Sequence, residues 1–297
     1  MADQRVLRPD PTSPSHLRAL FRRYGFRPRR RLGQTFLVDG NIARKIVHAA
    51  QLTGMEPVLE IGPGAGAVTG LLAEQARRVV AIELDTVMVA VLGETVGPDV
   101  EVMHADFLGV ELDDLLASEV RGSWRCVANL PYAITGPAII RLLEAAAWFD
   151  RIVVMVQQEV ARRLLAPPGD RTRGLLTVLA EASCKVSSVG HVSRRCFFPQ
   201  PKVDSTILAF QVRQPPLVPP DVMPAFERIV KAAFSTRRKT LANALSGPSG
   251  AELEKQDATR LLSQSGIEPG RRAESLSAEE FVALTNRFVE MTEKVRE

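Results

Sequence analysis

A short apolar run leads directly into a glycine-rich turn at residues 57–66, Pro57-Val58-Leu59-Glu60-Ile61-Gly62-Pro63-Gly64-Ala65-Gly66. Residues 58–61 are typical of a buried strand, and the pattern from Val68 onward is typical of a helix. Glycines at such a junction let the backbone approach a ligand closely, and the start of the helix offers unpaired N–H groups. The segment therefore predicts a strand–turn–helix unit with a ligand at the turn.

The same alternation continues along most of the chain. Besides 58–61, the expected strands are 79–84, 100–104, 125–129, 152–156, 185–192 and 205–212. The helical patterns between them are 42–52, 68–76, 87–94 and 137–147. This order predicts an α/β fold with a mostly parallel sheet that is covered on both faces. The last two strands have no full crossover helix between them, so we expect an antiparallel pair at the sheet edge.

Domain boundaries follow from changes in pattern. Residues 1–30 are rich in arginine and proline and predict a basic arm with one helix around residues 17–24. The α/β domain is expected over 31–213, and four prolines within residues 214–220 predict a linker. Beyond it, a helical domain over 221–297 is expected, with helices at 223–234, 238–245, 254–263 and 278–291. Ser277 is the expected cap of the last helix.

Charge is concentrated at the front of the chain. The net charge is +4, but the first 34 residues hold nine arginines against two aspartates, so the remainder carries −3. A basic arm on a mildly acidic body suits a polyanion such as nucleic acid, and a solubilising tail is an equally good interpretation of charge alone. Because no apolar run is long enough to cross a bilayer and no secretory signal begins the chain, we expect a cytoplasmic protein. The three cysteines lie far apart, so no metal site is expected.

Polar or glycine residues stand at four successive strand ends, namely Gly62, Glu83, Asp106 and Asn129. Ligands of open α/β sheets bind outside the carboxyl ends of the strands. Glu83 follows Gly62 by 21 residues, where a carboxylate can accept hydrogen bonds from both ribose hydroxyls. Asp106 could accept from an adenine amino group or could simply cap a helix. The G-x-G-x-G spacing differs from the dinucleotide fingerprint, so a different nucleoside cofactor is favoured.

The fourth strand ends in Asn129-Leu130-Pro131-Tyr132, which suits chemistry at the amino group of adenine. That nitrogen is a poor nucleophile because its lone pair is delocalised into the ring. The Asn129 side-chain oxygen and the Leu130 carbonyl can together accept hydrogen bonds from both N–H groups as positive charge develops. Pro131 stiffens the turn, and Tyr132 offers a face on which the base can stack. Methyl transfer to this nitrogen requires alignment rather than a metal or a strong base.

A second aromatic candidate lies in Phe197-Phe198-Pro199-Gln200-Pro201-Lys202. The prolines hold this segment extended, so one phenylalanine could close over a flipped-out base opposite Tyr132. Two phenylalanines buried in the core are the alternative.

With these motifs in place, the chain closely resembles the ribosomal RNA adenine dimethyltransferases of the kasugamycin-sensitivity type. The resemblance covers residues 25 to 290 and rests on six segments in the same order: 31–37, 60–66, 82–85, 129–132, 197–205 and 234–240. It implies a Rossmann-like, seven-stranded methyltransferase sheet with a helical C-terminal domain. It also implies the use of S-adenosyl-L-methionine, with S-adenosyl-L-homocysteine as the product. The expected reaction is dimethylation at N6 of two adjacent adenosines in the 3′-terminal hairpin loop of 16S rRNA, during biogenesis of the small (30S) subunit, by a monomer.

Site residues carry over from the resemblance by matched position. The expected cofactor contacts are Thr35, Leu37, Gly62, Gly64, Glu83, Asp106 and Asn129. The expected catalytic group is Asn129, Leu130, Pro131, Tyr132 and Phe197. The expected RNA contacts are Arg29, Arg30, Arg31, Lys202, Arg237, Arg238 and Lys239.

Two positions depart from the family pattern, which usually has asparagine at Thr35 and at Ala133. Neither is the proposed base acceptor. Three other functions remain in competition: an erythromycin-resistance methyltransferase acting on large-subunit RNA, an NAD-dependent oxidoreductase, and an assembly factor that binds RNA without catalysis. The first typically has isoleucine and phenylalanine where this chain has Leu130 and Tyr132.

Overall fold

The computed structural model describes residues 8–29, 33–236, 238–247, 251 and 253–293. The chain forms two compact units. Unit 1 comprises residues 1–161 and 187–212, and unit 2 comprises residues 162–186 and 213–297. Among the described residues, no helix is long and apolar enough to span a membrane.

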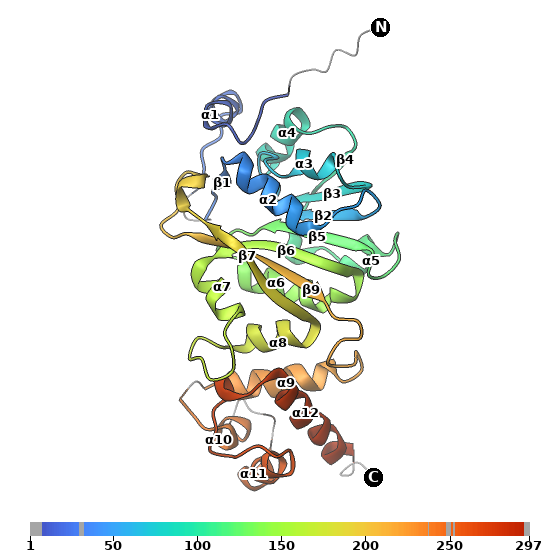
Figure 1. Cartoon of the computed structure of the whole chain (residues 1–297), viewed down its shortest axis with the longest axis vertical. Helices are drawn as coiled ribbons and strands as arrows, with labels where there is room; N and C mark the ends of the chain where they lie inside the picture. Colours follow the sequence, from blue (N-terminus) through green and yellow to red (C-terminus); the bar gives the residue numbers. More distant parts are fainter. Residues whose placement is uncertain (1–7, 30–32, 237, 248–250, 252, 294–297) are drawn as a thin grey trace. The chain divides into compact units, whose positions relative to one another are not determined.

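A seven-stranded sheet forms the centre of unit 1 (Figure 1). Its strands are β2 (Pro57–Ile61), β3 (Arg78–Glu83), β4 (Val100–His104), β5 (Trp124–Asn129), β6 (Phe149–Gln157), β7 (Cys184–Val192) and β9 (Ser205–Val212). They lie in the order β4-β3-β2-β5-β6-β9-β7. The first five are joined by parallel pairings, and β9 runs antiparallel to β6. The last two of these strands along the chain therefore take the last two positions at one edge of the sheet, as expected, with β9 antiparallel to its neighbour β6.

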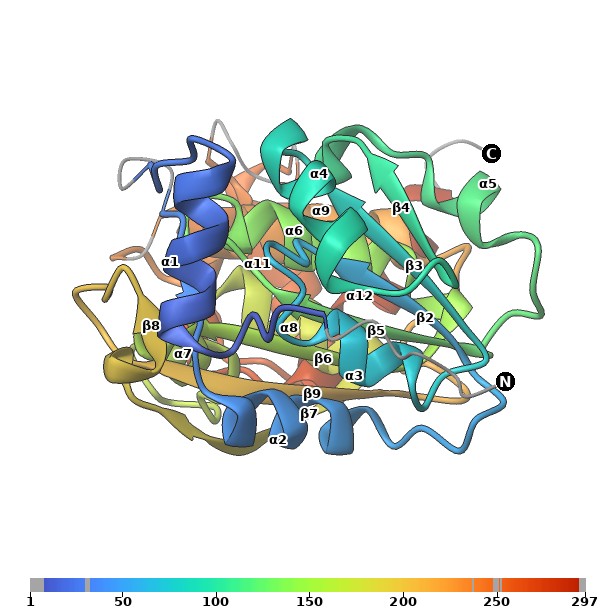
Figure 2. The same cartoon turned by 90° about the horizontal axis from the view of Figure 1, so that it is seen from above.

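Helices cover this sheet and bury its inner strands on both faces. The helices between the strands are α2 (Gly40–Ala50), α3 (Thr69–Ala73), α4 (Thr86–Thr95), α5 (Leu112–Leu116) and α6 (Thr135–Glu144). Helix α2 packs along one face against β5, β6 and β9, where Figure 2 shows it from above. Its apolar residues Ala43, Ile46 and Val47 join a core with Val58 of β2. All five residues of β2 are buried, as expected for a strand covered on both faces.

The N-terminal segment folds onto unit 1 through aromatic contacts. Helix α1 (Pro14–Arg23), which the sequence predicted, buries Leu17, Leu20 and Phe21. Two short strands, β1 (Phe36–Leu37) and β8 (Phe197–Phe198), pair antiparallel, with Phe36 opposite Phe198. Phe21 and Phe36 share a small apolar cluster with residues of α4, so helix α1 is anchored beside α4.

Unit 2 is helical. It contains the end of α7 (Gln158–Leu164), all of α8 (Leu175–Ser183), and α9 (Met223–Phe234), α10 (Leu241–Leu245), α11 (Lys255–Gln264) and α12 (Ala278–Glu293). Ser277 caps α12, because its hydroxyl accepts from the Glu280 amide at 3.2 Å while the Glu280 carboxylate accepts from the Ser277 amide at 2.8 Å.

Residues 162–186 belong to unit 2, although the sequence placed the boundary at 213. Helix α8 packs on α9 and α12. Arg173 is 1% exposed and donates to both oxygens of Glu181, at 2.8 and 2.5 Å, and to the carbonyls of Ala166 and Leu276. The proline-rich segment also packs here, because Val218 is buried and the Leu217 amide donates to the Ala182 carbonyl. The expected linker is thus part of the folded unit.

Candidate active site

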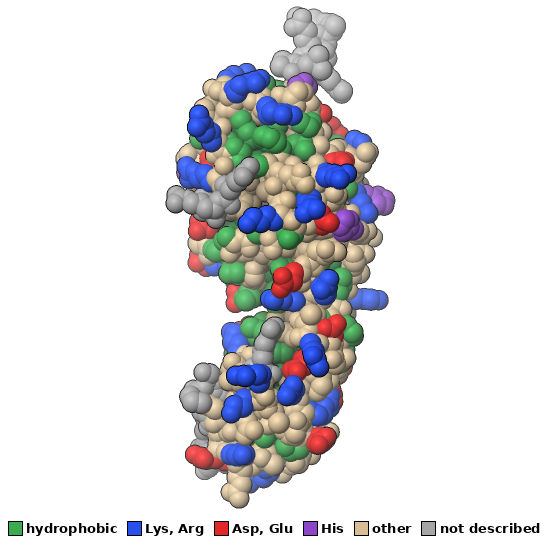
Figure 3. All heavy atoms as spheres, turned by 90° about the vertical axis from the view of Figure 1, so that its left-hand side faces the viewer, with side chains coloured by type: hydrophobic (Ala, Val, Ile, Leu, Met, Phe, Trp, Pro, Cys, Tyr) green, Lys and Arg blue, Asp and Glu red, His purple; other side chains and the backbone are tan. Residues whose placement is uncertain are grey.

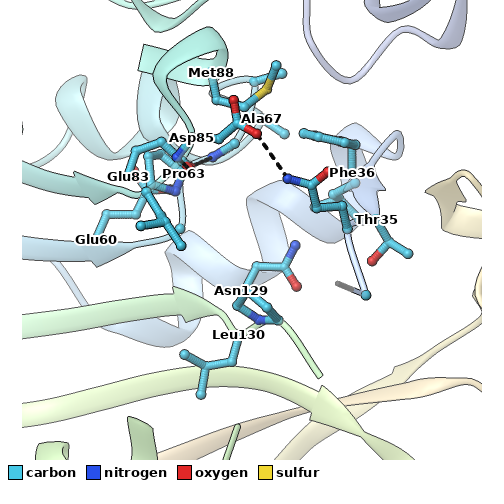
Figure 4. A pocket seen from close by; sticks show the side chains of 18 of the residues that line it. Thr35, Phe36, Glu60, Pro63, Ala67, Glu83, Asp85, Met88, Asn129 and Leu130 are labelled. Atoms are coloured by element: carbon cyan, nitrogen blue, oxygen red, sulfur yellow. Dashed lines mark hydrogen bonds between the residues drawn. The ribbon is translucent and has the colours of Figure 1, made fainter. Parts of the chain in front are cut away.

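A cavity of about 370 Å³ lies at the carboxyl ends of β2, β3 and β5 in unit 1 (Figure 4). Residues 33–37 form one wall, the turn after β2 forms a second, and the turn after β5 forms a third. Parallel strands bring their carboxyl ends to one edge of the sheet, which explains why segments far apart in the sequence meet here. Of the four strand-end residues that the sequence predicted at a ligand site, Gly62, Glu83 and Asn129 line this cavity, and Asp106 does not.

The glycine-rich turn after β2 depends on the absence of side chains. Gly62 and Gly64 have φ angles of +68° and +58°, in the left-handed region that favours glycine. At Gly66, where φ is +90°, a Cβ atom would lie 2.9 Å from the Thr95 hydroxyl oxygen and 3.0 Å from a methyl carbon of Val96. The turn therefore presents bare backbone to the cavity and packs closely against α4.

Two buried carboxyl groups face this turn. Glu83, at the end of β3, is 8% exposed and accepts hydrogen bonds from the amides of Gly64, at 3.0 Å, and Asp85, at 2.9 Å. Burial raises the pKa of Glu83, and those two amide donors partly oppose the shift. Glu60 in β2 is 3% exposed, and burial raises its pKa to about 8, with the nearby Glu83 charge adding to the rise.

The residues that line the cavity fit a nucleoside cofactor with a cationic group. Oε2 of Glu60 is buried and has no hydrogen-bond partner among the described residues, so a ligand donor would satisfy it. Glu83 is held in place by backbone amides and keeps lone pairs for ribose hydroxyls. Among the described residues, no group of three or more His, Cys, Asp or Glu side chains could hold a metal ion.

Asn129 ends β5, and its side chain points into the cavity between the glycine turn and residues 33–37 (Figure 4). No hydrogen bond to its amide group occurs within the part of the chain that the structure describes. The Leu130 side chain is 1% exposed, so this residue can offer only its backbone to the cavity. The Pro131 carbonyl accepts from the Thr135 hydroxyl and the Ile134 amide, both at 3.1 Å, which anchors the turn to α6.

The wall formed by residues 33–37 contains a contact that the sequence did not reveal. The Gln34 side chain donates to Asp85 at 3.2 Å and accepts from the Arg29 amide at 2.9 Å. It thereby joins the N-terminal segment to the end of β3. Thr35 and Leu37, both expected as cofactor contacts, line the cavity beside it. The only sequence signal for Gln34 is that it is a polar residue within segment 31–37.

Leu84 is a second lining residue that the sequence reasoning missed. Its side chain is 63% exposed although it directly follows a buried strand. An exposed leucine beside Glu83 offers an apolar face next to the expected ribose site. A strand-end leucine in the sequence gives no sign of such exposure.

Three of the expected cofactor and catalytic residues do not line this cavity. Asp106 caps a short 3₁₀ helix by accepting from the Leu108 amide at 3.0 Å, which is the alternative that the sequence left open. Phe197 is 4% exposed within the core under α2, because the β1–β8 register sets it opposite Leu37. Tyr132 is half-buried, and its hydroxyl lies 3.4 Å from the Ser205 hydroxyl.

The expected RNA-contact residues are dispersed. Arg29 lines the cavity, and Lys202 is exposed after β8 in unit 1. Arg238 and Lys239 are exposed on unit 2. Arg30, Arg31 and Arg237 lie outside the described residues.

Comparison with known proteins gives a consistent result over nearly the whole chain. The model of the family described as ribosomal RNA adenine dimethylase matches residues 25–290. Ribosomal RNA small subunit methyltransferase A of Geobacter metallireducens is 42% identical over 263 residues, which are 88% of this chain and 95% of that protein. The protein of the same name from Geobacillus kaustophilus is 40% identical over 283 residues, which are 93% of this chain and 96% of that protein.

Two solved structures are also similar. A dimethyladenosine transferase from Plasmodium falciparum has a TM-score of 0.73 at 26% identity and covers 87% of this chain and 98% of its own. The 23S rRNA methyltransferase ErmE has a TM-score of 0.63 at 29% identity, and the match covers 85% of this chain and 98% of ErmE. The sheet and the cavity at its edge therefore belong to a fold that carries methyltransferases.

Proposed function

Because this chain belongs to the ribosomal RNA adenine dimethylase family, we propose that it dimethylates N6 of two adjacent adenosines in the 3′-terminal hairpin loop of 16S rRNA. The methyl donor in this proposal is S-adenosyl-L-methionine. The observation that supports it most strongly is the Asn129 amide, which ends β5, points into the cavity and has no partner among the described residues.

In the proposed complex, Glu83 accepts hydrogen bonds from the ribose hydroxyls of the cofactor. The backbone of the turn at Gly62 and Gly64 packs directly against the cofactor. Glu60 faces the cationic amino group. Thr35, Leu37 and Leu84 supply the remaining walls. When bound, the cofactor supplies an electrophilic methyl group.

The chain's own task is to make the adenine nitrogen a better nucleophile. Oδ1 of Asn129 and the Leu130 carbonyl accept hydrogen bonds from its two N–H groups, so that its lone pair turns toward the methyl carbon. Pro131, whose carbonyl is held by Thr135, fixes the direction of these acceptors. Tyr132 stacks on the base. No protein group takes a proton during the transfer itself, and the proton that the methylated nitrogen then loses passes to solvent, so alignment accounts for most of the rate.

We propose further that the enzyme acts on immature 30S particles, as a monomer, in the cytoplasm. The residues that would contact phosphates are Arg29, Arg30, Arg31, Lys202, Arg237, Arg238 and Lys239. Such contacts position the RNA, whereas Asn129 and its neighbours recognise the base.

The main alternative within the family fold is methylation of large-subunit RNA, which ErmE represents. Purified protein should be incubated with labelled S-adenosyl-L-methionine and, in parallel, immature 30S particles and protein-free 23S rRNA. We expect label in the 30S particles alone. Label in 23S rRNA alone would overturn the substrate assignment. Binding to 30S particles without any transfer would instead favour a non-catalytic assembly factor.

A further inference from the structure

A second cleft, of about 500 Å³, lies in unit 1 between α1 and Phe198. We call it the arginine–phenylalanine cleft. Its lining is Arg18, Phe21, Arg22, Gly25, Phe26, Arg27, Pro28 and Phe198. Its volume falls in the range of roughly 300–1,000 Å³ that is usual for small-molecule sites. No acidic side chain lines it, so its polar lining is entirely cationic.

The positive charge of this cleft is not neutralised within the described part of the protein. Arg18 and Arg22 stand four residues apart on α1, where like charges repel and weaken a helix. Arg22 and Arg27 are exposed and form no ion pair with any described residue, whereas neighbouring Arg23 pairs with Glu94. Arg18 donates to the Pro14 carbonyl at 3.0 Å but also lacks an acidic partner in the described ranges. An anion in the cleft would offset this repulsion.

The aromatic lining gives the cleft a flat, apolar surface as well. The guanidinium carbon of Arg18 lies 5.4 Å from the centre of the Phe198 ring, and Phe198 is only half-buried. An arginine stacked on a phenylalanine is a surface on which any nucleobase can stack. In Figure 3, hydrophobic side chains on one face of unit 1 are bordered by lysine and arginine side chains. A phosphate alone would not need such a surface, but a nucleotide would.

The cleft adjoins the candidate active site through one aromatic ring. Phe36 lines the active-site cavity, and its ring centre lies 4.8 Å from that of Phe21 and 5.8 Å from that of Phe26, which line the cleft. The backbone also connects the two, because Arg27 and Pro28 border the cleft while Arg29 borders the cavity. A strand with one nucleotide in the cavity can therefore reach the cleft with a nearby one.

We propose that the arginine–phenylalanine cleft binds an unpaired nucleotide of the substrate RNA close to the target adenosines. Its base stacks against Phe198 and Arg18, and its phosphate contacts Arg22 and Arg27. The identity of this RNA rests on the proposed function. The cleft itself holds a nucleotide that is not methylated.

The test uses full-length protein and small-subunit particles reconstituted with 16S rRNA whose 3′-terminal segment is synthetic. The cleft variant carries Arg18→Gln, Arg22→Gln and Arg27→Gln. A control variant carries Arg44→Gln, Lys45→Gln and Arg121→Gln, which removes the same charge from exposed positions elsewhere on unit 1. In the cleft variant we expect KM for particles to rise about tenfold, with kcat changed less than about twofold. The control variant should remain close to wild type.

Abasic nucleotides, introduced one at a time around the two adenosines, test whether a base is recognised. At one position, the abasic nucleotide should raise the KM of wild-type protein about tenfold. The same abasic nucleotide should raise the KM of the cleft variant hardly further, because both changes remove the same contact. Independent, multiplicative effects would overturn the proposal, as would equal losses in the control variant. Both variants should bind S-adenosyl-L-homocysteine as wild type does. A weaker cofactor affinity in the cleft variant would assign its arginines to the active-site cavity and would also overturn it.

Failure of the proposed function gives a different result. If wild-type protein transfers no methyl group to any particle, a filter-binding assay can still measure the affinity. The assay compares wild type and cleft variant, each with intact particles and with particles that carry one abasic nucleotide. Coupling between the cleft variant and one abasic position would then support the cleft without the reaction. If no abasic position showed such coupling in the binding assay, the proposal that the cleft binds a nucleotide would be overturned.

Discussion

The carboxylate of Glu83 accepts a hydrogen bond from the backbone amide of Gly64 at 3.0 Å, which ties the end of β3 to the turn after β2. The same carboxylate accepts from the Asp85 amide at 2.9 Å, so both of its oxygens are oriented by backbone groups. A carboxylate held in this way needs little rearrangement to bind a ligand. The cavity is therefore organised by its own backbone for the ribose that we propose there.

Replacing this carboxylate tests that arrangement. Glu83→Gln should weaken the binding of S-adenosyl-L-homocysteine by about 10- to 100-fold, because the amide has one acceptor oxygen and turns a donor toward one backbone N–H. Titration calorimetry measures the affinity. Glu101→Gln, on an exposed carboxylate of β4 that pairs with Arg78, is the matched control and should leave the affinity unchanged. Equal affinities for the Glu83 variant and wild type would remove Glu83 from the cofactor site.

Buried Glu60 should give the cofactor-free protein a distinct pH dependence. Burial raises its pKa from 4.5 to about 8, so between these values the folded state binds more protons than the unfolded state. The contribution to the free energy of unfolding is fully present below about pH 4.5 and is lost as the pH rises through about 8.

Glu60→Gln removes this titration, so the stability difference between variant and wild type should grow as the pH rises across the window. Urea unfolding at several pH values measures it. Glu111→Gln, on an exposed acid at the start of α5, should run parallel to wild type. Parallel curves for wild type and Glu60→Gln would show that Glu60 titrates normally.

The close packing of the glycine turn predicts a stability difference between two glycines. Gly66→Ala should lower the free energy of unfolding by about 2 kcal/mol, because φ is +90° and the new Cβ would meet Thr95 and Val96. Gly70→Ala in α3 meets nothing within 4 Å and should be neutral or stabilising. Urea unfolding of both variants checks the ranking. If the two variants were equally stable, the turn would not require glycine at residue 66.

Asn129 should matter for transfer more than for cofactor binding. Asn129→Ala removes the side-chain acceptor for N6, so we expect methyl transfer to be abolished while the affinity for S-adenosyl-L-homocysteine stays within about an order of magnitude. Labelled transfer to 30S particles and calorimetry give the two values. Asn41→Ala, at an exposed position on α2, is the control for handling and folding. A near-normal rate for Asn129→Ala would exclude the hydrogen-bond account of N6 activation.

The sheet could be predicted from sequence because each strand is a local apolar run. The bounds of β4 and β9 match the expected ranges, and β2, β3 and β5 differ by a residue at one end or both. The polar strand ends followed from the same pattern, since parallel strands finish at one edge. Gly62, Glu83 and Asn129 line the cavity accordingly.

Features that depend on contacts between distant segments could not be predicted in this way. Strands β1 and β8 have two residues each and pair across about 160 positions, which leaves no periodic pattern. The sequence showed that Phe197 lies in an extended segment, but only the pairing with Leu37 decides that its ring turns into the core. Arg173 looks like a surface residue until the fold brings the distant Leu276 carbonyl, as well as Glu181 and the Ala166 carbonyl, within hydrogen-bond distance.

The identity and positions of the methylated nucleotides test the central claim most directly. Immature 30S particles should be incubated with this protein and isotopically labelled S-adenosyl-L-methionine, and fragments of their 16S rRNA analysed by mass spectrometry. We predict N6,N6-dimethyladenosine, carrying the label, at two adjacent adenosines of the 3′-terminal hairpin loop. Labelled methyl groups only at other nucleotides, or none at all, would contradict the account.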